Sequence, residues 1–440
     1  MKILIVETVW MGRARYGIFD KTLLTAFSIL PTLQARQFAA ITPRQHVVTV
    51  INERYQPVDF TQRYDVVLIN FTTPTAPRAY EIADAFRAKG IPVVLSGIHA
   101  SAAPKEAKNH ADSVLLGRGE PVWMTVLEDV EHGRLQPFYS SVPYSSVKVI
   151  PPTLVSLPGF VMTGAVEATR GCPYQCDFCP ETHLSGGQPF FKRPVGEVIE
   201  EISRIPQRTI MFYDETLTVD PMYAKELFSR LIGMRKRFFC NGNVDVLARD
   251  AELVRLSRRA GCVAWFIGFE SPSQASLDSY QKRTNRIEEY HQAVDNIHRN
   301  RMAVFGSFML GADTETSEVF EQTRQFITDL GLDVVDFCIL TPLPGTPLFQ
   351  RMEAEGRLLT TDWSRYTLNQ VVFQPKQMTT QQLLRGTQEL YRWFYSPKNT
   401  VRRLVHSLRF GIRGCVVVSV RNLVAAMAAR RLFQQEAKRR

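Results

Sequence analysis

The chain has 440 residues, 45% hydrophobic and 22% charged, so it is long enough for two or three domains and too apolar for a disordered chain. Its seven cysteines do not indicate a disulfide scaffold, and three of them lie within eight residues, which indicates a reduced compartment and a metal site. The formal net charge is +10, but eleven Lys or Arg and one Glu fall in residues 398–440, so residues 1–397 are neutral and only the tail is basic.

Apolar runs and helical stretches alternate through the first 140 residues. We expect helices at residues 21–37 and 79–89, and strands at residues 3–6, 47–51, 66–70, 93–96 and 113–116. Apolar strands separated by helices predict a parallel sheet covered on both faces. We therefore expect a Rossmann-like α/β domain at residues 1–140, with ligands at the carboxyl ends of its strands. No cleavable signal sequence is recognised, so we expect a cytoplasmic protein.

A second alternating series follows a segment rich in proline and serine, residues 138–158, which is interpreted as a linker and placed at residues 141–160. Strands are expected at residues 165–169, 209–213, 237–241, 263–269, 304–310 and 334–341. Asp220 and Asp250 suit helix N-caps, and Gly261 suits a helix end. Six strand–helix units predict a partial (β/α)6 barrel at residues 161–355, because a full eightfold barrel needs about 250 residues. Residues 356–440 are expected to be helical.

Three cysteines, Cys172, Cys176 and Cys179, directly follow the first predicted barrel strand. Thiolates are the usual ligands of iron–sulfur clusters, which normally have four cysteines, whereas the next cysteine here is Cys240 on another predicted strand. Three ligands would leave one iron open to a substrate or cofactor, as in catalytic metal sites. A structural zinc site with His183 as fourth ligand, or a structural group of cysteines, is the alternative.

This CxxxCxxC spacing, with Phe178 before the last cysteine, resembles the radical S-adenosylmethionine superfamily. Further matches follow in the order of the family, at residues 212–215, 267–271, 308–316 and 340–347. Together they cover about residues 160–350. The resemblance implies a [4Fe–4S] cluster held by the three cysteines, with S-adenosylmethionine bound at the open iron.

The resemblance also implies contacts to S-adenosylmethionine at the carboxyl ends of the predicted strands, where barrel side chains converge on a ligand. These residues are Asp214, Glu215, Gly268, Glu270, Ser271, Gly311 and Pro342. Arg283 is a further candidate, as a partner of the methionine carboxylate. Helix capping or surface solvation is the alternative for Asp214 and Glu270.

Residues 96–101 and 117–121 resemble the cobalamin-binding domain that precedes the barrel in one class of this superfamily. The implied cobalamin contacts are Ser96, Gly97, His99, Gly117 and Glu120. The pattern departs from the family at Ser96, where glycine is common, and at Arg118, where an acidic residue is common. No Asp-x-His-x-x-Gly occurs, so a histidine-ligated cobalamin is not indicated, and a polar loop histidine is the alternative for His99. For the N-terminal domain as a whole, the alternative is a degenerate domain that keeps the fold but binds no cobalamin.

Apolar residues in the basic tail recur at helical spacing, at Val401, Leu404, Val405, Leu408 and Ile412. No apolar run approaches the length of about 20 residues that spans a bilayer. An amphipathic helix on an anionic membrane surface, at the inner face of the membrane, is one interpretation. A helix packed on the barrel is the other, and nucleic-acid binding lacks a supporting motif.

The resemblance implies an enzyme that cleaves S-adenosylmethionine reductively, with an electron from an external donor such as flavodoxin or ferredoxin, and modifies an unactivated carbon. With cobalamin, the expected outcome is C-methylation of a hydrophobic small molecule such as a lipid, an isoprenoid or a tetrapyrrole. Oxidation, cyclisation or rearrangement without methylation is the alternative. A non-enzymatic iron–sulfur sensor or cobalamin-binding module is a further alternative.

Overall fold

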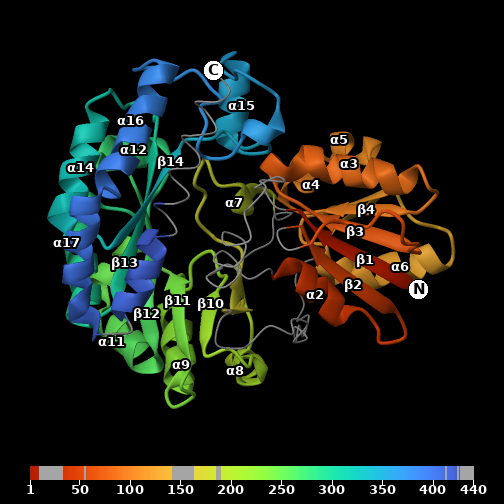
Figure 1. Ribbon diagram of the computed structural model, residues 1–440, viewed down its shortest axis with the longest axis horizontal. Coiled ribbons are helices and arrows are strands. Elements are labelled where there is room, and N and C mark those ends of the chain that lie inside the picture. The colour runs from red at the N-terminus through yellow and green to blue at the C-terminus, as the bar shows by residue number, and fades with distance from the viewer. Residues whose placement is uncertain are drawn as a thin grey trace. The chain divides into compact units, whose positions relative to one another are not determined.

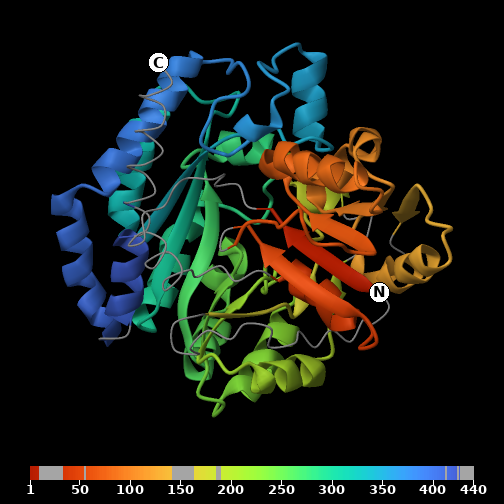
Figure 2. The same ribbon diagram turned by 45° about the vertical axis from the view of Figure 1, so that its right-hand side comes forward.

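A computed structural model describes residues 1–8, 33–53, 56–140, 163–184, 190–411, 414–423 and 426 (Figures 1 and 2). The predicted linker, most of the predicted helix 21–37 and the end of the tail lie outside these residues. Contacts divide the chain into two compact units, which are taken in turn below. The first comprises Met1–Ala165, Arg170–Ile205 and Pro342–Thr367, and the second Val166–Thr169, Pro206–Thr341 and Leu368–Arg440.

A six-stranded parallel sheet forms the centre of the first unit. Its strands are β1 (Lys2–Glu7), β2 (Val47–Asn52), β3 (Val66–Asn70), β4 (Val93–Ser96), β5 (Ser113–Leu116) and β6 (Phe138–Ser140), in the order β2-β1-β3-β4-β5-β6. The first five confirm the strands expected from the apolar runs. The sequence did not reveal β6, because its three residues open the segment that was interpreted as linker.

Helices cover both faces of this sheet, as the apolar strands predicted. The helices are α2 (Gln34–Ile41), α3 (Ala76–Arg87), α4 (Ile98–Ala102), α5 (Pro104–Asn109) and α6 (Trp123–Glu131). Figure 1 shows α3, α4 and α5 on one side of the sheet and α2 on the other. Val67 packs with Phe86 of α3, whereas Leu68 packs with Phe38 of α2 and Trp123 of α6. The arrangement confirms a Rossmann-like fold, in which ligands bind at the carboxyl ends of the strands.

The rest of the first unit carries the three clustered cysteines. A two-stranded sheet joins β8 (Thr169–Arg170) to β9 (Phe191–Lys192), and the cysteine loop (residues 171–179) runs from β8 to helix α7 (Pro180–Leu184). Helix α8 (Val195–Arg204) follows β9, and α15 (Pro347–Ala354) and the short helix η3 (Trp363–Arg365) complete the unit.

The second unit is built on an open parallel sheet with the order β14-β13-β12-β11-β10-β7. The strands are β7 (Gly164–Val166), β10 (Thr209–Phe212), β11 (Arg237–Asn241), β12 (Cys262–Glu270), β13 (Ala303–Leu310) and β14 (Val334–Ile339). Its helices are α9 (Pro221–Leu231), α10 (Val244–Arg249), α11 (Ala251–Ala260), α12 (Gln274–Ser279), α13 (Ile287–Arg299) and α14 (Val319–Leu330). Strand–helix alternation confirms the partial barrel, although the first predicted strand is split into β7 and β8.

Helix ends in the second unit follow the sequence signals. Asp220 accepts hydrogen bonds from Met222 N and Tyr223 N at the start of α9, and Asp250 accepts one from Leu253 N at the start of α11. Gly261 ends α11 with a φ of 113°, a conformation that favours glycine. Both N-caps and the helix end are confirmed.

The C-terminal region is helical, with α16 (Thr380–Phe394), α17 (Pro397–Ser407), the short helix η4 (Leu408–Phe410) and helical residues 414–423. Strand β12 turns Trp265 toward Phe228 of α9 and Phe269 toward Tyr290 of α13. Its alternate residues Ala264 and Phe266 pack instead with Phe410 and Val418 of the tail. Within the described residues, no helix combines the length and apolarity needed to cross a bilayer.

Candidate functional site

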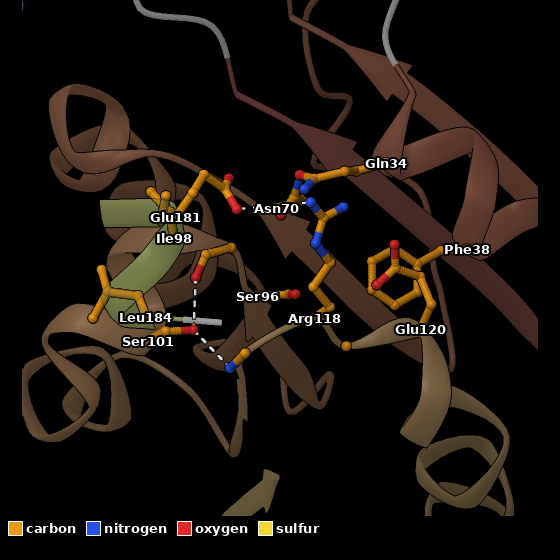
Figure 3. Close-up of a pocket in the computed structure, with 13 residues that line it drawn as sticks. Gln34, Phe38, Asn70, Ser96, Ile98, Ser101, Arg118, Glu120, Glu181 and Leu184 are labelled. Atoms are coloured by element: carbon orange, nitrogen blue, oxygen red, sulfur yellow. Dashed lines mark hydrogen bonds and ion pairs between the residues drawn. The ribbon is translucent and has the colours of Figure 1, made fainter. Parts of the chain in front are cut away.

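A pocket lies where β3, β4 and β5 end in the first unit (Figure 3). Four of the five predicted cobalamin contacts line it, namely Ser96, Gly97, Gly117 and Glu120. Residues of α2 and α7 complete its wall. The pocket therefore stands at the edge of the sheet where doubly wound folds bind their ligands.

Two glycines leave bare backbone beside this pocket. Gly97 has a φ of 116°, and a Cβ there would collide with Phe71 O and lie 2.8 Å from Asn70 Oδ1. A Cβ on Gly119 would lie 2.9 Å from the ring of Phe38. Glycine is therefore required at position 97 by its positive φ and by the backbone of Phe71, and a side chain at position 119 would have to displace Leu115 and Phe38.

The polar groups of the pocket are only partly bonded. Ser101 Oγ accepts a hydrogen bond from Gly117 N (2.9 Å) and donates one to Gly97 O (3.2 Å), joining the ends of β4 and β5. Glu120 is 3% exposed, and its Oε1 has no hydrogen-bond partner among the described residues. Since buried polar atoms are normally bonded, this oxygen is suited to a ligand that donates an N–H, such as a carboxamide of cobalamin.

His99, the fifth predicted cobalamin contact, is fully buried and does not line this pocket. Its Nδ1 lies 3.2 Å from Thr73 Oγ1 and its Nε2 lies 3.6 Å from Glu106 Oε1. Trp363 packs edge-on against the imidazole and donates a hydrogen bond to Glu106 (2.9 Å). Contact with His99 is the main cause that lowers the pKa of Glu106. The geometry favours the structural interpretation of this histidine.

The cysteine loop is held from within by α7. Cys176 is buried, Cys172 and Cys179 are half-buried, and none of the three is in a disulfide. Thr182 Oγ1 donates to Tyr174 O (2.9 Å), and His183 Nε2 lies 3.2 Å from Cys176 O. This ring nitrogen is thus used by the loop backbone, which disfavours a zinc site with His183 as fourth ligand.

The donor set fits an iron–sulfur cluster. No group of three or more His, Cys, Asp or Glu in the described part of the chain is arranged around a single metal ion. Each thiolate of a [4Fe–4S] cluster binds a different iron, so its cysteines need not meet at one point. Three cysteine thiols outside any disulfide on one loop are the ligands that such clusters use.

Charged contacts also hold the cysteine loop from outside. Arg170, before the loop, has Nη2 3.9 Å from Glu120 Oε1, and Glu181, after it, has Oε2 3.7 Å from Arg118 Nη2. Within the loop, Asp177 Oδ2 lies 3.0 Å from Arg351 Nη1 of α15, and Leu348 N donates to Asp177 O. The loop is therefore anchored to the pocket on one side and to α15 on the other.

In the second unit, Asp214 follows β10 and is almost fully buried. Its carboxylate accepts hydrogen bonds from Thr169 N (2.5 Å), Thr169 Oγ1 (2.6 Å) and Ala168 N (3.2 Å). Burial raises the pKa of Asp214 to about 6, and these hydrogen bonds oppose the rise. Asp214 thus fixes the backbone that leads toward β8, and Glu215 follows it as a half-buried residue.

Two of the predicted residues, Ser271 after β12 and Gly311 after β13, form hydrogen bonds with Glu315. Ser271 Oγ donates to Glu315 Oε1 (2.9 Å), and the N–H groups of Gly311 (2.8 Å) and Ala312 (3.1 Å) donate to its Oε2. Burial raises the pKa of Glu315. The sequence placed Glu315 in a matching motif, but nothing in the sequence identified it as the centre of these bonds.

Glu270 has a φ of 64°, a conformation that is uncommon for this residue type and often marks functional sites. Its carboxylate folds over Gly268, where a Cβ would collide with it, and pairs with Lys282 Nζ at 2.9 Å. No sequence signal pointed to Lys282.

Two other predicted residues lie apart from Glu270 in the chain. Arg283 is exposed, and Pro342 is a buried residue of the first unit.

Two family models match the chain. The radical SAM superfamily model matches residues 166–327. A domain of unknown function, DUF4070, matches residues 346–412.

Two curated relatives come from Chlorobaculum tepidum. Bacteriochlorophyllide d C-12(1)-methyltransferase is 30% identical over 387 residues, which cover 83% of this chain and 83% of the relative. Bacteriochlorophyllide d C-8(2)-methyltransferase is 28% identical over 410 residues, which cover 84% of this chain and 89% of the relative.

Among solved structures, the chain is similar to TsrM, a radical S-adenosylmethionine methyltransferase from Kitasatospora setae with cobalamin and a [4Fe–4S] cluster bound. The TM-score is 0.63 at 15% identity, and the match covers 80% of this chain and 75% of TsrM. At this identity the likeness concerns the fold.

Proposed function

The chain belongs to the radical S-adenosylmethionine superfamily, in the class with an N-terminal cobalamin-binding domain, and from this we propose that it methylates a carbon of a hydrophobic small molecule. The observation that carries the proposal is the pocket at the ends of β3, β4 and β5, which is lined by Gly97, Gly117 and the buried carboxylate of Glu120. We propose the division into a cobalamin domain (1–140), a linker (141–160), a barrel (161–355) and a helical region (356–440).

We assign Cys172, Cys176 and Cys179 to the [4Fe–4S] cluster. When bound, the cluster supplies the electron that cleaves S-adenosylmethionine, and cobalamin supplies the methyl group. Gly97 and Gly117 admit cobalamin to the backbone, and Glu120 accepts a hydrogen bond from it. Ser96 lines the same wall, whereas His99 acts by packing behind it.

For S-adenosylmethionine we propose contacts from Glu270 and Gly268 at the end of β12. Glu270 is held by Lys282, and its left-handed backbone presents it at the strand end, where a carboxylate can accept bonds from hydroxyl or ammonium groups. Ser271 and Gly311 shape this end through Glu315. Asp214 positions the chain leading to the cysteine loop, and Glu215 and Pro342 remain proposed contacts.

Two relatives that act on bacteriochlorophyllide support a tetrapyrrole as the substrate class, with an isoprenoid lipid as the alternative. The electron donor we propose is a flavodoxin or a ferredoxin. Radical chemistry without methylation is the second candidate function.

The test is product mass. Full-length protein is reconstituted with iron, sulfide and cobalamin under anaerobic conditions, then given S-adenosylmethionine carrying a deuterated methyl group, a reductant and either a chlorophyllide-type tetrapyrrole or an isoprenoid lipid. The proposal expects one labelled methyl in the tetrapyrrole, and none with Cys176→Ser. A product that has lost hydrogens without gaining a labelled methyl would support the non-methylating alternative instead.

We also propose that α17 rests on an anionic membrane surface. This helix buries Arg403 and Ser407 and exposes Val401 and Val405, and Leu408 of η4 continues the stripe; each of the three is at least 59% exposed. Arg402 and Arg409 are exposed beside this apolar stripe. An apolar stripe flanked by basic side chains fits the interface of anionic lipid.

Flotation with vesicles of anionic or neutral phospholipid tests this surface without shortening the chain, because Phe410 and Val418 are part of the barrel packing. Val405→Asp should lower binding to anionic vesicles about tenfold, and Val47→Asp, at a residue 63% exposed in β2, should leave it unchanged. Equal binding of both variants would contradict the proposal.

A further inference from the structure

The loop that follows β5 contacts both ends of the cysteine loop. Within this bridging loop (residues 117–120), Arg118 pairs with Glu181, two residues after Cys179. Glu120 pairs with Arg170, two residues before Cys172. One short loop thus holds the chain on both sides of the three cysteines.

The same two side chains form part of the pocket wall (Figure 3). Arg118 and Glu181 both line the pocket, so their ion pair stands at its surface. Glu120 lines it as well, and its Oε1 has no hydrogen-bond partner in the part of the chain that the structure describes. A ligand in the pocket would therefore contact the Arg118–Glu181 pair and lie beside the buried carboxylate of Glu120.

The pair between Glu120 and Arg170 is incomplete without a further donor. Their side chains are 2% and 4% exposed, and the 3.9 Å separation is too long for a hydrogen bond. A buried ion pair is stabilising only when hydrogen bonds satisfy its remaining oxygens. A ligand N–H on Glu120 Oε1 would supply that bond and hold the carboxylate beside Arg170.

We propose that Arg118 and Glu120 are positioning residues that couple occupancy of the pocket to the order of the cysteine loop. A ligand with carboxamide N–H groups completes the bonding of Glu120 and restrains Arg170, while contact with the Arg118–Glu181 pair restrains the start of α7. The cysteine loop is then ordered from both ends. The inference rests on the proposed function for the identity of the ligand, cobalamin.

Hydrogen exchange of the full chain without its cluster tests this coupling, because no turnover is needed. Exchange in residues 170–184 is compared with and without hydroxocobalamin. In the wild type, bound cobalamin should slow exchange in these residues at least about threefold. Glu120→Gln should lose most of that slowing. Glu53→Gln, at a partly buried carboxylate paired with Arg78 outside the pocket, should keep it.

The second pair gives an independent readout if Glu120→Gln folds poorly. Arg118→Gln and Glu181→Gln should each reduce the cobalamin-induced slowing, and the double variant should reduce it no further than the larger single effect, because coupled residues are not additive. In reconstituted protein, cobalamin should also shift the electron paramagnetic resonance signal of the reduced cluster, and Glu120→Gln should abolish that shift.

The outcomes separate the two proposals. Cobalamin that binds without slowing exchange in residues 170–184 overturns the coupling alone, as does equal slowing in Glu120→Gln and wild type. Failure of the wild type to bind cobalamin overturns the proposed function and the coupling with it.

Discussion

The two parallel sheets of this protein use their strand ends differently. In the first unit, β4 is followed by Gly97, where the backbone of Phe71 leaves no room for a Cβ, and Glu120 nearby has an Oε1 with no hydrogen-bond partner among the described residues. In the second unit, Asp214 follows β10 and Glu315 lies in the loop after β13, and the carboxylate of each accepts three hydrogen bonds from the protein. A polar side chain at a strand end can therefore bind a ligand only where the protein itself does not already satisfy its hydrogen bonds.

Glu270 lies between these cases. Its Oε1 pairs with Lys282, and its backbone is left-handed with a φ of 64°. We therefore propose Glu270 as a ligand contact and Asp214 as a residue that supports the backbone.

The largest effect is expected at Glu315. Glu315→Ala should lower the free energy of unfolding by about 3 kcal/mol or more, because it leaves the buried donors of Ser271, Gly311 and Ala312 without an acceptor. Urea unfolding measures this. Glu318→Ala, at an exposed neighbour, should change it by less than about 0.5 kcal/mol. A stable Glu315→Ala protein that no longer binds S-adenosylmethionine would show instead that Glu315 is a ligand contact.

Gly97 tests the bare backbone of the first unit. Gly97→Ala should cost about 2–3 kcal/mol, because its φ of 116° and the approach of Phe71 O leave no room for a Cβ, and cobalamin should bind about tenfold more weakly or worse. Gly90 also has a positive φ, but a Cβ there would meet no other atom. Gly90→Ala should therefore lower the stability only by the cost of a left-handed backbone, about 1 kcal/mol. Thermal unfolding and cobalamin titration check both, and equal effects of the two variants would remove the steric argument.

Asp214 should reveal its support role through pH. Its folded-state pKa of about 6 lies above the usual value, so the native state binds this proton more tightly, and the stability that this group contributes rises as pH falls from about 7 to 4. Asp214→Asn does not titrate and should be less stable at pH 7 by about 1–2 kcal/mol, since its amide nitrogen faces a backbone donor. The deficit should widen toward pH 5 in thermal melts of the cluster-free protein, and a deficit that narrows contradicts the assignment.

The smallest effect is expected at His99. His99→Gln keeps a polar group near Thr73 and should cost about 1 kcal/mol of stability. The affinity for cobalamin should change by no more than about twofold, and the absorption bands of the bound cobalamin should stay where they are. A changed spectrum of the bound cobalamin would place His99 at the corrin after all.

Much of the fold follows from local sequence. Strands β1 to β5 and β10 to β14 were predicted within about two residues, because each is an apolar run bounded by helical signals such as Asp220 and Gly261. Strand β6 was not, because three residues beside a proline-rich segment carry no periodicity. The split between β7 and β8 was also not predicted, because residues 165–169 carry no break signal and look like one continuous strand.

The site could be predicted only in part. Spacing identified the cysteine loop, and the resemblance identified the glycines of the pocket. Glu120 pairs with Arg170, 50 residues later, and Ser271 with Glu315, 44 residues later, and the residue types alone do not indicate such long-range pairs. In the tail, periodicity found the apolar stripe, but its exposure depends on Arg403 being buried over Phe394.

The central claim is that Cys172, Cys176 and Cys179 hold a cluster that works beside a separate cobalamin site. Anaerobic wild type and Cys176→Ala should be compared for iron, bound cobalamin and 5′-deoxyadenosine formed from S-adenosylmethionine with dithionite. The account predicts about four irons per wild-type chain and product formation, and a variant that loses both but still binds cobalamin. A wild type that stays free of iron after reconstitution, or a Cys176→Ala variant that still forms the product, would contradict it.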